Sequence, residues 1–318
     1  MTLLITGATG HVGYALVREA ARRGEAVVAQ HRGGLDPKRA AAVEGNVRWV
    51  AIDLNDRDAV AAAIARENVD RCIHCAAVAT EFEARKAPAA AFDANVRTVV
   101  NVLEAMRQSG KAERFVLVST GSVFQRMEDL TVELEEATPV GVIGLYSTTK
   151  HCAELMTECY RSQLGMPATT VRISMVYGPP VRVSPGQILR GPIPAMIAGA
   201  LAGQPVCFGR QFEASYTYID DVVEGLLAVA GGAPPAHGLY HVVPGRNFTC
   251  DEVAEIVRRV VPGADIVLED SKLPWTEYAR MRGPMIDTRL ASERGFRLGH
   301  TLETGIAAYV DWWRRTAT

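Results

Sequence analysis

A strict alternation of short apolar runs and longer amphipathic segments constrains this chain more than any other feature. The apolar runs cover residues 3–6, 26–30, 47–52, 71–75, 115–119 and 170–174. The intervening segments with apolar residues at helical spacing are 12–23, 57–67, 92–109 and 146–164. Strands that alternate with helices are joined by crossover connections, which produce a parallel sheet covered on both faces. We therefore predict an α/β fold with a doubly wound parallel sheet.

The composition excludes several classes of protein. The chain has 318 residues, 34 basic and 36 acidic side chains and a net charge of −2, so it lacks the excess of positive charge that nucleic-acid binding requires. Charged residues interrupt the apolar stretches well before the roughly 18 residues that span a membrane. The N-terminus has no basic segment of a secretory signal, and we expect a cytoplasmic protein.

Turn-forming residues crowd into the stretch after Tyr177, beginning with Gly178-Pro179-Pro180. Here we expect the passage from a first domain, residues 1–177, into a smaller α/β domain. The smaller domain is expected to hold 178–215 and 233–318, while 216–232 return to the first domain. Within this half we predict strands at 216–219 and 239–243, and helices at 222–230, 251–260 and 301–315. Thr249 and Glu252 have the spacing of a capping box before the second of these helices.

Three glycines, Gly7, Gly10 and Gly13, follow the first predicted strand and lead directly into the first predicted helix. Glycine at these positions allows a tight turn, a close approach to a pyrophosphate and close packing of helix on strand, while the helix N-terminus supplies amides. In this strand-turn-helix context the pattern predicts a dinucleotide site on a Rossmann-type sheet.

The end of the second strand bears on which dinucleotide is bound. NAD sites usually place an acid there for the ribose 2′-hydroxyl, whereas an arginine accommodates the 2′-phosphate of NADP. This strand ends in Gln30-His31-Arg32 with no acid. We therefore favour NADP, with NAD as the alternative. Asp53, after the third strand, is expected either to bind the adenine amino group or to cap the next helix.

Tyr146 and Lys150 are four residues apart on a predicted helix and so share one face. A neighbouring ammonium lowers the pKa of a phenol, and we expect Lys150 to prepare Tyr146 for general acid or base catalysis in this way. Ser119 and Thr120 end the fifth strand, at the edge where parallel sheets bind ligands. A hydroxyl there is placed to bond the reacting oxygen.

The glycine loop, the hydroxyl at the strand end and the Tyr/Lys helix, in that order, resemble the extended short-chain dehydrogenase/reductase family, also called the NAD-dependent epimerase/dehydratase family. Further matching segments are 74–77, 95–96, 172–179, 218–222 and 302–306. The resemblance implies that the first domain binds the cofactor and the smaller one the substrate, and that Thr120, Tyr146 and Lys150 form the catalytic group. It also implies a homodimer through a four-helix bundle near Asn95 and Tyr146.

The residues expected around the cofactor combine the loop, the strand ends and the family resemblance. In that resemblance Ala76 and Ala77 line the nucleotide and Lys150 holds the nicotinamide ribose. The complete expected set is Gly7, Thr9, Gly10, His11, Val12, Gly13, His31, Arg32, Asp53, Leu54, Ala76, Ala77, Asn95, Lys150, Ile173 and Val176.

Two departures from the family pattern bear on the substrate. Dehydratases of the family carry an Asp-Glu pair directly after the strand-end threonine, where this chain has Gly121-Ser122. Nucleotide-sugar members carry an arginine at the position of Ala214, for which Arg182, Arg190 or Arg210 are possible substitutes. We therefore predict an oxidoreductase acting on a hydroxyl or carbonyl of a small or sugar-like molecule. A nucleotide-sugar epimerase is the alternative, and a non-catalytic dinucleotide-binding regulator is the third possibility.

The six cysteines are expected to be free thiols. Cys72 and Cys75 form a CxxC, but it lies inside an apolar strand without a second such pair, so we interpret it as structural. The histidines have no metal-ligand spacing with nearby carboxylates, and no metal site is predicted. His11 is expected to face the solvent or the phosphates.

Overall fold

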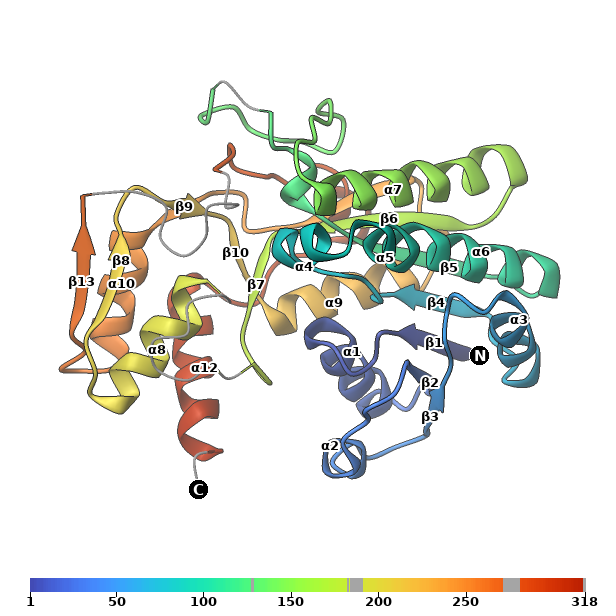
Figure 1. Ribbon diagram of the computed structural model, residues 1–318, viewed down its shortest axis with the longest axis horizontal. Coiled ribbons are helices and arrows are strands. Elements are labelled where there is room, and N and C mark those ends of the chain that lie inside the picture. Colours follow the sequence, from blue (N-terminus) through green and yellow to red (C-terminus); the bar gives the residue numbers. More distant parts are fainter. Residues whose placement is uncertain (127–128, 182, 184–190, 271–280, 317–318) are drawn as a thin grey trace.

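The computed structural model describes residues 1–126, 129–181, 183, 191–270 and 281–316. A seven-stranded parallel sheet forms the larger part, with strands in the order β11-β6-β5-β4-β1-β2-β3 (Figure 1). These strands are β1 (Thr2–Thr6), β2 (Ala26–His31), β3 (Val47–Ala51), β4 (Arg71–His74), β5 (Arg114–Thr120), β6 (Ala168–Ile173) and β11 (Leu239–Val242). The predicted Rossmann-type α/β fold is confirmed.

Neighbouring residues of each strand pack on opposite faces of the sheet. Leu3 and Ile5 belong to one buried apolar cluster, whereas Leu4 between them belongs to another. The first cluster includes α1 (His11–Arg22) and α9 (Ile219–Ala230), and the second includes α3 (Arg57–Arg66), α6 (Thr98–Ser109) and α7 (Leu145–Leu164). Helices therefore cover both faces, which is why nearly every side chain of the central strands β1, β4 and β5 is buried.

A smaller group of elements lies beside the carboxyl edge of this sheet (Figure 1). It contains α8 (Pro192–Ala202), α10 (Cys250–Val260) and α12 (Leu302–Arg315), with three strand pairs. The pairs are β7 (Met175–Tyr177) with β10 (Tyr216–Tyr218), β9 (Glu213–Ala214) with β12 (Phe248–Thr249), and β8 (Val206–Gly209) with β13 (Ile266–Glu269). The predicted capping box of Thr249 and Glu252 is present at the start of α10.

The division into domains stays a prediction, but one strand lies outside the expected grouping. The strand β11 was placed with the smaller domain, and it pairs in parallel with β6 at the edge of the large sheet. Its apolar residues Tyr240 and Val242 are fully buried there. Sequence order alone could not show this, because the chain leaves the sheet after β6 and returns to it.

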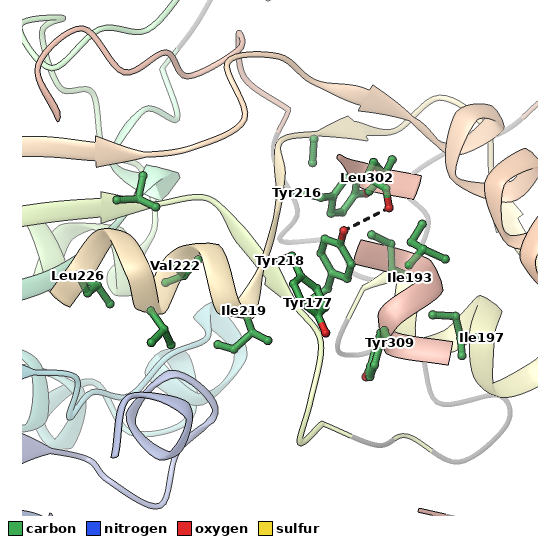
Figure 2. Close-up of a cluster of buried hydrophobic side chains, with 14 of the residues drawn as sticks. Tyr177, Ile193, Ile197, Tyr216, Tyr218, Ile219, Val222, Leu226, Leu302 and Tyr309 are labelled. Atoms are coloured by element: carbon green, nitrogen blue, oxygen red, sulfur yellow. Dashed lines mark hydrogen bonds between the residues drawn. The ribbon is translucent and has the colours of Figure 1, made fainter. Parts of the chain in front are cut away.

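Buried aromatic side chains join the two parts. Tyr177, Tyr218 and Tyr309 pack together around α12, and the Tyr177 hydroxyl donates to the Leu302 carbonyl over 3.3 Å (Figure 2). Gly305 allows this approach, because a Cβ at this position would stand 2.2 Å from the Tyr177 hydroxyl oxygen.

The remaining helices and turns of the described residues are short. They are α2 (Pro37–Ala41), α4 (Glu81–Lys86), α5 (Pro88–Phe92), α11 (Leu290–Arg294), the π-helical turn η1 (Asp93–Arg97) and the 3₁₀ turn η2 (Gly121–Val123). The helix predicted over 92–109 thus starts with a π-helical turn. Among the described residues, no helix is long and apolar enough to cross a membrane.

Candidate active site

The glycine loop connects β1 to α1 as predicted. Gly7 has φ +62°, and a Cβ on Gly13 would lie 2.3 Å from the Gly7 carbonyl oxygen, so α1 packs directly on the loop. The N-cap residue of α1 is Gly10, and no side chain caps this helix end. A cradle of backbone amides without a capping side chain fits the pyrophosphate of a dinucleotide.

The end of β2 is tied to the glycine loop by Gln30. The Gly7 N–H donates to Gln30 Oε1 over 2.9 Å, and Gln30 Nε2 donates to the Ile52 carbonyl over 2.7 Å. His31 follows, half-buried, and Arg32 is exposed. This strand end therefore presents a guanidinium and no carboxylate.

One of the expectations after β3 differs from the structure. Asp56 and not Asp53 caps α3, accepting the Ala59 N–H over 3.0 Å, which leaves Asp53 exposed. The interpretation of Asp53 as the cap is therefore wrong. The Leu54 side chain is only 5% exposed and packs in the core beneath the sheet, and its place in the cofactor site stays a prediction.

Arg39 is a second cation near the glycine loop that sequence reasoning missed. Its Nη1 donates to the Thr9 carbonyl over 3.3 Å, and its guanidinium stands 4.1 Å from the centre of the Tyr14 ring. It comes from α2, which the predicted helices did not include. Its pairing with Tyr14 depends on how α2 folds back over α1.

The loop after β4 lies against the glycine loop. The N–H groups of Cys75 and Ala76 both donate to Thr6 Oγ1, over 3.1 and 3.2 Å, and the Ala76 backbone touches Gly7. Ala77 is exposed beside them. The structure thus places Ala76 and Ala77 next to the expected dinucleotide site.

Asn95 holds this loop in place. The buried Asn95 amide accepts the Val78 N–H over 2.8 Å and donates to the Val78 carbonyl and to Thr149 Oγ1. Its hydrogen bonds therefore join the loop after β4 to α7. We therefore expect Asn95 to contribute to cofactor binding by holding the loop after β4 in position.

His11 differs from its expected position. Its Nε2 donates to the Gly178 and Pro179 carbonyls, 3.0 and 3.2 Å away, and so links the start of α1 to the stretch after β7. Val12 is the next residue of α1, and both are half-buried. Ile173 ends β6 and Val176 lies in β7, also half-buried.

Tyr146 and Lys150 lie in the first two turns of α7, on one face as predicted. Lys150 is buried, and its Nζ donates to the Val118 carbonyl of β5 over 2.7 Å. Burial lowers the pKa of Lys150 to about 8, against the opposing effect of Glu154. Lys150 thereby fixes α7 to the carboxyl end of β5.

The surroundings of Tyr146 differ from the expectation in one important respect. Burial raises the pKa of the Tyr146 phenol above its usual value, while a hydrogen bond with the Thr120 side chain and the charge of Arg282 oppose this rise. The lowering cation is therefore Arg282, and not Lys150, whose Nζ is bound to β5. Thr120 and Tyr146 meet as predicted.

Glu81 caps the helix that carries Tyr146, a function that sequence reasoning missed. Its carboxylate accepts the N–H groups of Leu145 and Tyr146 over 3.1 and 2.9 Å, where the N-cap residue Gly144 offers no side chain. A Cβ on Gly144 would collide with this carboxylate at 2.4 Å. These bonds, together with Arg85, hold the pKa of Glu81 below its usual value in spite of burial.

A buried ion pair supports the same region from behind. Glu154 accepts two hydrogen bonds from Arg172, over 2.9 and 2.8 Å, and one from Ser119 Oγ over 2.6 Å. The pKa of Glu154 is about 2, because hydrogen bonds from His151 and Arg172 outweigh its burial. This pair joins α7, β5 and β6 below the site.

Of the three arginines considered as substitutes for an arginine at position 214, the structure describes only Arg210, which is paired elsewhere. Ala214 is buried in β9, and Arg210 forms ion pairs with Asp251 and Asp270. Arg182 and Arg190 lie outside the described residues. The arginine that does reach the Tyr146 end is Arg282, whose guanidinium nitrogens Nε and Nη2 would each be 3.2 Å from a Cβ on Gly121.

Cys72 and Cys75 are free and lie within and directly after β4. Burial raises the pKa of both thiols, that of Cys75 to about 12. Both are therefore protonated near neutral pH, which agrees with a structural role. No cluster of His, Cys, Asp or Glu that could hold a metal occurs in the part of the chain that the structure covers.

The structure has the arrangement of a Rossmann-type dinucleotide-binding fold. This arrangement consists of a parallel sheet, a glycine loop at a helix N-terminus and a Tyr/Lys helix at the carboxyl edge of the sheet. The sequence pattern of the NAD dependent epimerase/dehydratase family matches residues 3–237. The chain therefore belongs to this family of enzymes, as the resemblance implied.

Individual relatives match over the whole chain. A dTDP-glucose 4,6-dehydratase of Xanthomonas campestris pv. campestris (strain B100) is 27% identical over 344 residues, covering 100% of this chain and 94% of the relative. UDP-glucuronate 4-epimerase 1 of Arabidopsis thaliana is 26% identical over 337 residues, covering 98% of this chain and 76% of the relative.

Solved structures show the same fold. A UDP-glucose 4-epimerase of Thermotoga maritima superposes with a TM-score of 0.86 at 20% identity, covering 100% of both chains. The Thermus thermophilus UDP-glucose 4-epimerase in complex with NAD has a TM-score of 0.85 at 24% identity, covering 99% of this chain and 100% of the other.

Proposed function

We propose that the protein transfers a hydride between a nicotinamide dinucleotide and a hydroxyl or carbonyl of a small or sugar-like substrate. One observation carries the proposal. The half-buried Tyr146 meets Thr120 at the carboxyl edge of the sheet, on the helix whose Lys150 is fixed to β5.

The chain's own residues have separate tasks in this reaction. The bound cofactor supplies or accepts the hydride. Tyr146 donates a proton to a carbonyl oxygen or takes one from a hydroxyl, and Thr120 holds the same oxygen by a hydrogen bond. Because burial raises the pKa of Tyr146, the phenol is protonated near neutral pH. A protonated phenol is the form that acts as general acid toward a carbonyl oxygen.

We propose that NADP is the preferred cofactor, held by the glycine loop, Ala76, Ala77 and Arg32. The absence of a carboxylate at the end of β2 and the exposed Arg32 support this choice. Of the similar solved structures, several are complexes with NAD by their descriptions. Arg32→Ala should weaken NADPH binding at least tenfold more than NADH binding, and equal effects would contradict the preference.

A nucleotide-sugar epimerase is the second candidate function. The names of relatives such as UDP-glucuronate 4-epimerase favour it. The same Tyr146 chemistry would serve, with the hydride returned to the same carbon. A dehydratase is disfavoured, although a relative bears that name, because Gly121-Ser122 provide no acid and base after Thr120.

The two candidates differ in net redox change. The protein with NADPH or NADP is incubated with free aldehydes, ketones, sugars and their alcohols, and with sugar nucleotides, while absorbance at the reduced nicotinamide band is followed. Net consumption or formation of reduced cofactor supports the oxidoreductase. Interconversion of sugar nucleotides without net change supports the epimerase, and the absence of both results would contradict both candidates.

We also propose a homodimer in the cytoplasm, with α6 and α7 at the interface. Exposed apolar side chains on α7 and on the neighbouring α5 support it, since Leu155 is 53% and Phe92 is 47% exposed in the single chain. Leu155→Glu should convert the dimer into a monomer in analytical ultracentrifugation. A wild-type monomer would contradict the proposal.

A further inference from the structure

Arg282 occupies a defined place at the reacting end of the site. Its guanidinium lies over Gly121, the residue directly after Thr120, and a Cβ on Gly121 would be 2.2 Å from Met285 Sδ and 3.2 Å from two Arg282 nitrogens. A larger residue at position 121 would displace the Met285 and Arg282 side chains from these places. The chain thus has a cation where the dehydratase pattern has an acidic pair.

The backbone around Arg282 is firmly anchored. Asn247 Nδ2 donates to the Arg282 carbonyl over 2.7 Å. In the segment that follows Arg282, the Pro284 carbonyl accepts the Leu134 N–H, and the Ile286 N–H donates to the Leu134 carbonyl. Gly283 packs so closely that a Cβ would be 1.9 Å from the Val132 carbonyl oxygen. These contacts fix the backbone from which the Arg282 side chain extends.

The guanidinium has no counter-charge in the described part of the chain. No carboxylate there forms an ion pair or hydrogen bond with the Arg282 side chain, whereas many arginines of the protein have one. Its neighbours are the phenols of Tyr146 and Tyr216. The Tyr216 side chain is 4% exposed, and its hydroxyl has no hydrogen-bond partner among the described residues.

Within the described residues, the Arg282 guanidinium and the Tyr216 hydroxyl are two donors without an acceptor, one of them charged, and they form an incomplete anion site. A half-buried cation of this kind is stabilised when an anionic group displaces the remaining water and pairs with it. A guanidinium matches the planar geometry of a carboxylate with two parallel hydrogen bonds. A phosphate with nearly two charges would call for a second cation, but Lys150 Nζ is bound to Val118.

We propose that Arg282 binds a carboxylate of the substrate next to the carbon that reacts at Tyr146, so that the substrate is a hydroxy acid, keto acid or sugar acid. This inference rests on the proposed function, because it takes Tyr146 as the group that meets the reacting carbon. Arg282 is then a substrate-binding residue. Gly121 is the residue that admits it.

The pairing has a consequence for Tyr146. Arg282 is the cation that lowers the pKa of this phenol, so a bound carboxylate neutralises that effect. The phenol is then held in its protonated form, which is the form that donates a proton to a carbonyl.

The test measures binding without turnover. The complex of the protein with NADP is titrated in a calorimeter with gluconate against glucitol and with glucuronate against glucose, two pairs that differ in a carboxylate. Glucose 6-phosphate is added as the phosphate probe. We expect at least one acid to bind about 30-fold more tightly than its neutral partner, the value of a charge-assisted hydrogen-bonded pair.

Variants separate this contact from general damage. Arg282→Gln should abolish the discrimination and Arg282→Lys should retain part of it. Arg66→Gln, which changes an exposed arginine at the end of α3, should leave it unchanged. Thermal unfolding shows whether each variant is folded. If Arg282→Gln does not fold, the lysine variant alone decides, by a discrimination at least threefold smaller than that of the wild type.

Three results overturn the inference. They are no preference for either acid in the wild type, unchanged discrimination in the Arg282 variants, or a preference for glucose 6-phosphate over both acids. Tyr146→Phe should keep the discrimination while losing turnover. A failure of the proposed catalysis would therefore appear in turnover alone, and a failure of the carboxylate site in binding alone.

Discussion

Removing the Glu81 carboxylate should loosen the helix that carries Tyr146. Glu81 comes from α4, 65 residues before Tyr146 in the sequence, and its two oxygens accept the first two amides of α7. The N-cap residue Gly144 cannot replace it. Glu81→Ala therefore leaves the Leu145 and Tyr146 amides without their acceptor and removes a negative charge from the positive end of a long helix.

The size of the effect follows from the exposure of these groups. The Glu81 side chain is 12% exposed, so water replaces it poorly at Tyr146, while Leu145, which is 39% exposed, regains a water partner. A hydrogen bond to a charged group contributes about 1.5–3 kcal/mol, and a helix cap typically about 1 kcal/mol. We expect a loss of about 2 kcal/mol in the free energy of unfolding. At about 2–4 °C per kcal/mol, Tm should fall by about 4–8 °C.

Urea unfolding and steady-state kinetics measure the two consequences. The value of kcat should fall at least tenfold, because small displacements of a catalytic group are costly, while the dissociation constant of the cofactor stays within about twofold of the wild-type value. Glu83→Ala is the matched control, since Glu83 lies in the same helix and its exposed carboxylate bonds Thr80, the N-cap residue of α4, and no amide of α7. Wild-type stability and kcat in Glu81→Ala would refute the assignment of Glu81 as the cap.

Three further substitutions have expected results. Glu154→Gln leaves the buried Arg172 without a counter-charge and should lower the free energy of unfolding in urea by about 3–5 kcal/mol at pH 7. Because the pKa of Glu154 is lowered to about 2, the difference between variant and wild type should shrink as the pH falls from about 4.5 toward 2. A difference that does not depend on pH would contradict the ionised pair. Gly13→Ala places a Cβ against the Gly7 carbonyl oxygen and should lower the free energy of unfolding by about 1–3 kcal/mol. It should also weaken NADPH binding, measured by cofactor fluorescence. Unchanged binding would contradict the assignment of the glycine loop to the cofactor site. Lys150→Met should raise the free energy of unfolding of the cofactor-free protein by about 2 kcal/mol at pH 7, because it removes a buried charge whose pKa is lowered to about 8. The wild type should itself become more stable as the pH rises from about 8 to 10.5, since the folded protein then loses the proton before the unfolded chain does. A wild-type stability that falls over that range would contradict the buried ammonium.

The larger part of the fold could be predicted because its signals are local. Runs such as Leu3-Leu4-Ile5 are apolar at every position, which a parallel strand buried on both faces requires. The glycine loop, the capping box at Thr249 and the pairing of Tyr146 with Lys150 on one helix face are likewise short-range patterns. Each is encoded within a few residues, so no knowledge of the tertiary structure was needed.

The residues that complete the site come from distant segments, and periodicity does not reveal them. Glu81 acts on α7 only because α4 packs against its N-terminus, and Arg282 reaches Tyr146 only through a segment near the end of the chain. No local pattern in the sequence indicates either contact. The choice between Asp53 and Asp56 as the cap was open to sequence reasoning, because Asp56 directly precedes the apolar pattern of α3.

The most direct test of Tyr146 as the proton donor is a single-turnover measurement on Tyr146→Phe with bound NADPH and a carbonyl substrate identified by the panel. The ring of this variant keeps its packing, so cofactor affinity and Tm should match the wild type. The rate of NADPH oxidation should fall by about 10²–10⁴-fold, the usual contribution of a general acid. A rate within a factor of about three of the wild type, with cofactor binding intact, would contradict the assignment of Tyr146 as the proton donor.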